Sequence, residues 1–123
     1  MISWNNIAEA DPAELLEEMK KNFTTKLPTQ IESVDEMKNA QKLLSKLASQ
    51  YSFLTAVAVE IKGIKRRMKR DKESKEKVDD MMEREEILTA YCDSVKMNYN
   101  AISRMITIRQ QIYDEYKMDK YVK

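Results

Sequence analysis

From Thr29 to its last residue the chain contains no proline and a single glycine, Gly63. Glycine and proline supply many of the backbone conformations that tight turns need, so few turns are expected in this stretch. Of the 123 residues, 35% are charged and nine are methionines, and runs of β-branched or aromatic residues are scarce. This composition favours helices over sheets. We therefore expect an all-α protein that forms a single helical domain over residues 1–123.

A capping pattern predicts a short N-terminal helix over about residues 11–25. Asp11 is a suitable N-cap whose carboxylate should accept hydrogen bonds from the first turn, and Pro12 suits the first helical position. Glu14 completes a capping box. The helix should end before Pro28, because the residue that precedes a proline disfavours helical geometry.

A second capping box, Ser33 to Glu36, precedes a long apolar seam. At alternating spacings of three and four residues the seam contains Met37, Ala40, Leu44, Leu47, Tyr51, Leu54, Ala58, Ile61, Lys65 and Met68. Only Lys65 is not apolar. The seam predicts a helix over about residues 34–70 that packs against a partner along its length.

Another seam predicts a helix over about residues 77–118. It contains Val78, Met81, Glu85, Leu88, Cys92, Val95, Tyr99, Ile102, Ile106, Arg109, Tyr113 and Tyr116. Tyr99 and Tyr113 are expected to pack in the core. Arg109 is expected either to pair with an acid on a neighbouring helix or to face an inner surface of an oligomer.

A continuous rod is the alternative to two separate helices. Extending the first seam past Met68 would place Lys72 and Asp79 in it, whereas the second seam restarts at Val78, one residue out of phase. A turn around Asp71–Lys77 and a long antiparallel hairpin are therefore predicted. The apolar stripe of each helix is too wide for one partner, so the N-terminal helix or other copies must cover the remainder. We expect a homo-oligomer.

Several kinds of chemistry lack their usual residues. The chain has no histidine, which is the usual neutral-pH general base and a common zinc ligand. Gly63 stands alone, so there is no Gly-rich phosphate loop. Cys92, on the seam, is expected to be a buried thiol. The acids of Asp79–Glu86 are interpreted as an acidic first turn that complements the helix dipole, rather than as a cation site. We expect no enzyme activity, cofactor or metal.

The sequence also lacks the signals of secretion and membrane insertion. The N-terminus has neither a basic segment nor an apolar stretch of the signal-peptide kind, and no apolar run approaches the ~20 residues that span a bilayer. A single cysteine fits a reducing compartment. We expect a cytoplasmic protein, in the host cytoplasm if it is phage-encoded, with no membrane contact.

The densest charge lies in IKGIKRRMKRDKESKEK, residues 61–77, with nine bases and three acids. The bases that a helix would project from neighbouring rows are Lys62, Lys65, Arg66, Lys69 and Arg70. Such a cluster neutralises phosphates without sequence preference. In a hairpin, however, residues 78–86, with five acids and one arginine, would lie beside the run and could pair with it. Both interpretations fit the sequence. Further bases, Arg104 and Arg109, lie among polar side chains of the second long helix.

Two single residues leave alternatives open. Gly63 indicates a close approach by a backbone or a ligand, a slight bend, or a tolerated residue of no particular role. Trp4, which precedes the first cap, either packs onto the bundle or anchors a partner, and packing is the favoured prediction.

The two long helices resemble the recombination mediator proteins of T4-like phages, the UvsY type. The resemblance covers roughly residues 39–116, and the segments that carry it are NAQKLLSKLASQYSFL, VEIKGIKRRMKR and ILTAYCDSVKMNYNAISRMITIRQQ. Its most similar piece is Ala101-Ile102-Ser103-Arg104 followed by Ile108-Arg109. The resemblance implies a small, helical, non-enzymatic oligomer that binds single-stranded DNA and helps a recombinase displace single-strand-binding protein. The DNA contacts that it implies are first Lys65, Arg66, Arg67, Lys69 and Arg70, and second Arg104 and Arg109.

Two functions are therefore expected. The first is a non-enzymatic oligomeric protein that binds single-stranded nucleic acid as an accessory factor in recombination or replication, with a recombinase or another host or phage protein as partner. The alternative is a phage-type helical adaptor or inhibitor that acts through protein–protein interaction and binds no nucleic acid.

Overall fold

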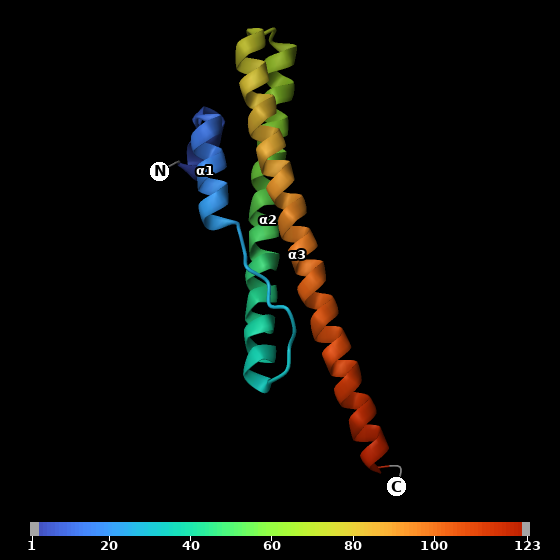
Figure 1. Ribbon diagram of the computed structural model, residues 1–123. Helices are drawn as coiled ribbons and strands as arrows, with labels where there is room; N and C mark the ends of the chain where they lie inside the picture. The colour runs from blue at the N-terminus through green and yellow to red at the C-terminus, as the bar shows by residue number, and fades with distance from the viewer. Residues whose placement is uncertain (1–2, 122–123) are drawn as a thin grey trace.

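The computed structural model describes residues 3–121, with side chains described as far as residue 117, and every regular element in that range is a helix. A short 3₁₀ segment, η1 (Trp4–Glu9), and a short helix, α1 (Pro12–Asn22), precede two long helices, α2 (Val34–Arg70) and α3 (Lys75–Tyr121). Figure 1 shows α2 and α3 as an antiparallel hairpin with α1 beside it. The predicted all-α hairpin with a short N-terminal helix is confirmed, and the continuous rod is excluded.

Only one of the two predicted capping boxes forms as expected. At the start of α2 the backbone amide of Glu36 donates to Ser33 Oγ at 3.0 Å, and the Ser33 hydroxyl donates to Glu36 Oε1 at 3.3 Å. Asp11 is the N-cap residue of α1 and Pro12 is its first residue, but the Asp11 carboxylate accepts no capping hydrogen bond. That part of the prediction is wrong. The Asp11 side chain is exposed, where water competes for its oxygens.

Helix α1 ends at Asn22, about three residues earlier than predicted. Phe23 leaves helical geometry, with φ −121° and ψ 16°, and its side chain turns into the core. Its ring stacks on Phe53 at a centroid distance of 6.2 Å, and Trp4 meets both rings edge-on, at 6.1 Å from Phe23 and 4.9 Å from Phe53. Burial of the Phe23 ring and its contacts with the other two rings offset the loss of a further helical turn. The favoured prediction that Trp4 packs onto the bundle is confirmed.

The predicted turn between the long helices is a tight C-cap. The Lys72 amide donates to Lys69 O at 3.2 Å, and the Glu73 amide donates to Met68 O at 2.9 Å. This pair of bonds is the Schellman motif, which requires left-handed geometry at the residue after the cap. Lys72 takes that geometry, with φ 56°, at a position where glycine is the common residue. Only residues 71–74 separate α2 from α3.

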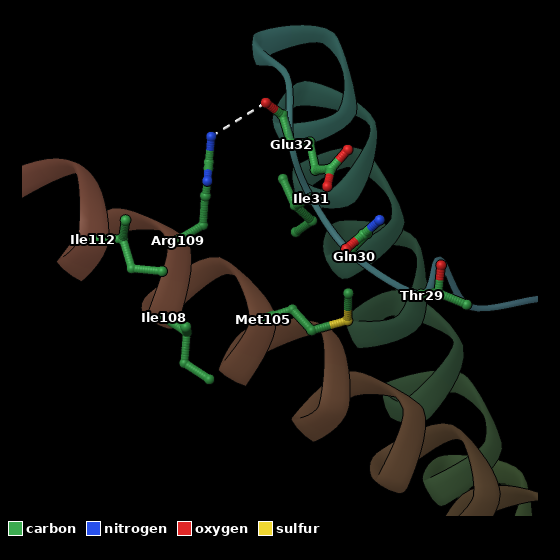
Figure 2. Close-up of a pocket in the computed structure, with 8 residues that line it drawn as sticks. All are labelled: Thr29, Gln30, Ile31, Glu32, Met105, Ile108, Arg109 and Ile112. Carbon is green, nitrogen blue, oxygen red and sulfur yellow. Dashed lines mark hydrogen bonds between the residues drawn. The ribbon is translucent and has the colours of Figure 1, made fainter.

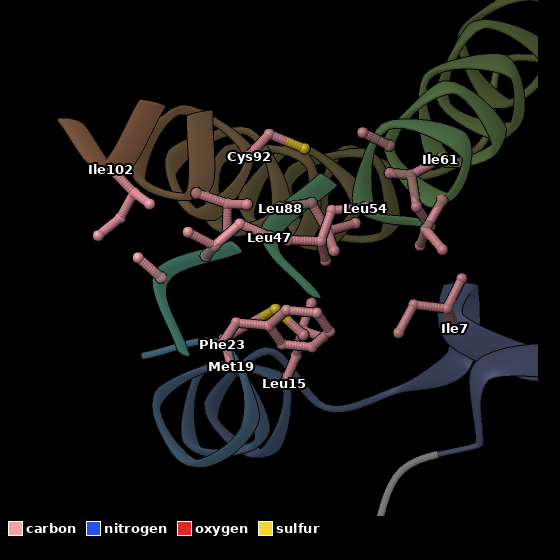
Figure 3. Packing of buried hydrophobic residues seen from close by; sticks show 14 of the residues in the cluster. Ile7, Leu15, Met19, Phe23, Leu47, Leu54, Ile61, Leu88, Cys92 and Ile102 are labelled. Carbon is pink, nitrogen blue, oxygen red and sulfur yellow. The ribbon is translucent and has the colours of Figure 1, made fainter. Parts of the chain in front are cut away.

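The two predicted seams meet along the hairpin and form most of the core. Their fully buried members include Leu47, Leu54, Ile61, Met81, Leu88, Val95 and Ile102. Cys92 is buried, as expected, and Tyr99 is half-buried. Figure 3 shows Leu15, Met19 and Phe23 of the N-terminal segment packed against this seam. The chain therefore covers part of its apolar stripe with its own N-terminal elements.

The far end of α3 departs from the prediction. Arg109, Tyr113 and Tyr116 continue the seam in sequence but are exposed, so the expectation that Tyr113 packs in the core is wrong. Figure 1 shows the reason, because α3 runs past the first residue of α2 and leans away from it. The connector before α2 also carries Ile31, which is buried, to this end of the hairpin.

Candidate nucleic-acid interface at the hairpin tip

The basic run occupies the last turns of α2, at the tip of the hairpin. Lys62, Arg66 and Lys69, named here the tip cations, are all exposed. Their spacing of four and three residues places them on one side of the helix. None of the three makes an ion pair within the part of the chain that the structure describes. The tip therefore presents a short row of cations to solvent.

Lys65 belongs to the hairpin interface instead. Its ammonium pairs with the Glu85 carboxylate of α3, and the two side chains are only 20% and 17% exposed. Lys65 is the one charged member of the first seam, and Glu85 is one of two charged members of the second, with Arg109. Removing either partner would leave a partly buried charge, which costs more than the loss of a surface pair. We assign Lys65 a structural role in joining α2 to α3.

Most of the acids in Asp79–Glu86 do not neutralise the tip cations directly. Among the described residues, the pair of Lys65 with Glu85 is the only ion pair between α2 and α3. The other pairs near the turn, Arg70 with Asp71 at 3.7 Å and Lys77 with Glu73 at 3.6 Å, are exposed and local. Pairs of this kind contribute about 0–1 kcal/mol each.

Two acids nevertheless lie close to this surface. Glu86 and Asp93 line an open cavity of about 420 Å³ together with Lys65 and Glu85. These acids lower the positive potential on the α3 side of the basic run. A phosphate backbone would therefore be favoured along the flank of α2 that carries the tip cations and disfavoured beside the acids of α3.

The remaining predicted contacts are not brought together with the tip cations. Arg67 lies on the opposite side of α2, because it is offset by about 200° from both Lys65 and Lys69. Arg104 lies roughly 45 Å along α3 from the tip, at 1.5 Å per residue. Arg109 is farther still, and its Nη2 donates to the backbone carbonyl of Glu32 at 3.2 Å.

Figure 2 shows the surroundings of Arg109, an open cavity of about 290 Å³ between the connector and α3. The Thr29–Glu32 segment forms one wall, and Met105, Ile108 and Ile112 form the other. Arg109 was expected to pair with an acid on a neighbouring helix or to face the inside of an oligomer. Within the described residues it instead binds a main-chain oxygen of the connector and no acidic side chain, and the alternative that it faces the inside of an oligomer stays a prediction.

Among the described residues, no atom outside the surrounding turns of α2 lies close to Gly63. A Cβ placed on it would meet no atom within 4 Å. The close approach of another backbone, which was one of the sequence-based alternatives, does not occur within the described residues. Gly63 is therefore free to be replaced without a clash in a single copy of the chain.

Arg84 makes a buried structural contact that the sequence analysis did not predict. It is 8% exposed, and its Nε donates to the backbone carbonyl of Ala10 at 2.6 Å. Ala10 follows η1, so this bond joins the N-terminal segment to α3. The available signal was its spacing, since Arg84 lies four residues before Leu88 and hence on the buried side of α3.

Other kinds of site find little support within the described residues. No group of three or more histidine, cysteine or acidic side chains is arranged to hold a metal ion. None of the described helices combines the length and the apolar composition that crossing a bilayer requires. Burial raises the pKa of the Cys92 thiol, which lowers its thiolate fraction near neutral pH.

No family model matches the chain, and neither the curated proteins nor the solved structures give a significant match. The resemblance to phage recombination mediators therefore depends on the quoted segments alone.

Proposed function

We propose that this protein binds single-stranded nucleic acid through the tip cations, as a non-enzymatic, oligomeric accessory factor of recombination or replication in the cytoplasm. The observation that carries the proposal is the exposed row of Lys62, Arg66 and Lys69 without ion-pair partners among the described residues. A helix that presents such a row neutralises backbone phosphates and releases their counterions. A recombinase is the proposed protein partner, as the family resemblance implies.

The proposed contact is electrostatic and independent of base sequence. Lysine and arginine on one helical surface can contact the phosphates of a flexible strand without reading its bases. Affinity should therefore depend steeply on salt and weakly on sequence.

The test is a fluorescence titration of single-stranded DNA with the intact protein at about 50 mM salt, where the electrostatic contribution is large. Replacing all three tip cations by alanine should weaken binding about tenfold or more. The slope of log K against log salt should fall by about 2, since each lost phosphate contact on a single strand contributes about 0.7. Alanine retains helix propensity, so the helical circular dichroism signal should persist.

A matched control lies on the same helix. Lys38, Lys42 and Lys46 are exposed lysines of α2 distant from the tip, and their triple alanine variant makes the same charge change. It should bind nearly as the natural protein does. Absence of binding at low salt, or an equal loss in both triple variants, would overturn the proposal.

The second candidate is a helical adaptor or inhibitor that engages a protein and no nucleic acid. It is favoured by the acids Glu86 and Asp93, which border the same surface and reduce its potential. The same titration separates the two functions, because an adaptor would leave the DNA unbound at every salt concentration.

A further inference from the structure

The C-terminal part of α3 presents an apolar row that is largely exposed in the described part of the chain. Its members, named here the α3 row, are Met105, Ile108, Ile112 and Tyr116. Met105 is half-buried, whereas Ile108, Ile112 and Tyr116 are 48%, 51% and 68% exposed. Their spacings of three and four residues align them along one side of the helix. Such a stripe is typical of a helix that packs against another helix.

Within the described residues, the rest of the chain meets the α3 row at Met105, which packs against the core, and along the flank that carries Arg109. Arg109 lies about 60° round the helix from Ile112 and binds the connector at Glu32. Figure 2 shows the connector on that side of α3, with the cavity between them open. The row itself and its other flank face solvent, so a second helix can approach from there.

The open flank carries opposite charges near the two ends of the row. Arg104 and Glu115 lie about 80° and about 60° from Ile112, both in the direction away from Arg109. Both side chains are exposed and make no ion pair within the described part of the chain. A surface with a cation at one end and an anion at the other is complementary to its own antiparallel copy.

The positions of the two isoleucines in the α3 row set the register of that antiparallel pairing. When Ile108 lies opposite the second copy's Ile112, the reciprocal contact forms by symmetry. Arg104 then lies within about one residue, or ~1.5 Å along the axis, of the second copy's Glu115. A parallel pairing would instead place the two charged flanks on opposite sides of the interface, so neither ion pair between Arg104 and Glu115 would form.

We propose that the α3 row is a self-association surface, on which a second copy of this chain packs antiparallel, with Ile108 against Ile112 and two reciprocal ion pairs of Arg104 with Glu115. The inference deepens the oligomeric part of the proposed function and rests on that part, not on nucleic-acid binding. It names the surface and the orientation that the oligomer uses.

The exposed area limits the strength of this contact. About half of each isoleucine and two-thirds of Tyr116, with the flanking residues, offer on the order of 500 Å² per copy. About 1,000 Å² in total is at the low end of specific interfaces. The association should therefore be concentration-dependent, with a dissociation constant in the micromolar range.

The test is sedimentation equilibrium of the intact protein over a range of concentrations, with charge-reversed variants. Arg104→Glu and Glu115→Arg should each weaken self-association about tenfold, because each places like charges at both ends of the row. The double variant should restore it, since the reversed pairs are again complementary. Lys117→Glu makes the same charge change on the far side of the helix and should have little effect.

Disulfide trapping tests the orientation. Chains with Ile108→Cys, mixed with chains with Ile112→Cys, should form a mixed disulfide on mild oxidation, and the buried Cys92 should contribute little. Disulfides between identical chains would indicate a parallel pairing and overturn the inference. A monomer at all concentrations, or an oligomer insensitive to both charge reversals, would overturn it as well. A monomer that still binds single-stranded DNA through the tip cations would leave the proposed binding intact.

Discussion

Replacing Gly63 by alanine should raise the free energy of unfolding by about 1 kcal/mol. Gly63 lies inside α2, seven residues before its last residue, with helical neighbours on both sides. A Cβ there would meet no atom within 4 Å, so the substitution introduces no clash. Its main effect is to restrict the unfolded chain and to improve helix propensity.

The magnitude follows from the helical position. Glycine is about 0.8–1.0 kcal/mol less favourable than alanine in a helix interior. For a chain of this size that corresponds to an increase of about 3–5 °C in the melting temperature. Ala56→Gly is the reverse change at an exposed position of the same helix, and it should cost a similar amount.

Urea unfolding followed by circular dichroism measures both variants, at one fixed protein concentration because self-association contributes to apparent stability. An unchanged or lowered stability for Gly63→Ala, together with the expected loss for Ala56→Gly, would refute the reasoning. That outcome would mean that another copy or partner packs against the bare backbone at Gly63. Single-stranded DNA affinity should be unaffected, because Gly63 contributes no charge to the tip.

Two further predictions concern the turn and the buried thiol. Lys72→Gly should stabilise the protein by about 1 kcal/mol in urea unfolding, because left-handed geometry is unfavourable for a residue with a Cβ. Lys72→Ala keeps a Cβ and should give no such gain. A thiol reagent near neutral pH should label Cys92 slowly in the folded protein and rapidly in denaturant, because burial raises its pKa. The raised pKa in the folded state also means that the Cys92 contribution to stability is complete below the ordinary thiol pKa and is lost as pH rises through the folded value. Rapid labelling of the folded protein would contradict the buried position.

The bounds of the hairpin were predictable because local signals and the seam agree. The cap at Ser33 marks the start of α2, and the loss of seam phase after Met68 marks its end. The pairing of Lys65 with Glu85 was also accessible in principle. Both are charged members of otherwise apolar seams, and a turn near residue 74 places them opposite each other.

The features that the sequence analysis missed all depend on how segments distant in sequence pack together. Tyr113 satisfies the seam spacing, but a sequence pattern does not reveal that α3 leans away from α2 toward this end of the hairpin (Figure 1). The buried hydrogen bond of Arg84 likewise depends on where η1 returns to the hairpin. The early end of α1 depends on an aromatic cluster whose third ring, Phe53, is distant in sequence.

For the candidate site, the sequence predicted a cluster of bases. It did not predict which of them are exposed together at the tip and which lie in the hairpin interface or far along α3. Heptad phase alone separated Lys65 from the exposed cations, while Arg104 and Arg109 were included as bases among polar side chains of the second long helix and by the family resemblance. The structure separates them by most of the length of α3. Which acids face the cations depends on the relative rotation of two packed helices, and a pattern of spacings on each helix leaves that rotation undetermined.

The length of α3 determines the distance between the two hairpin tips of a dimer. In the proposed antiparallel dimer the twofold axis passes near residue 110, about 35 residues from the tip, so the two tips would lie on the order of 100 Å apart and point in opposite directions. Such a dimer would hold two nucleic-acid-binding sites at a fixed separation. A short strand would occupy one tip with the affinity of a single contact, whereas a strand long enough to reach both would gain from the high effective concentration at the second.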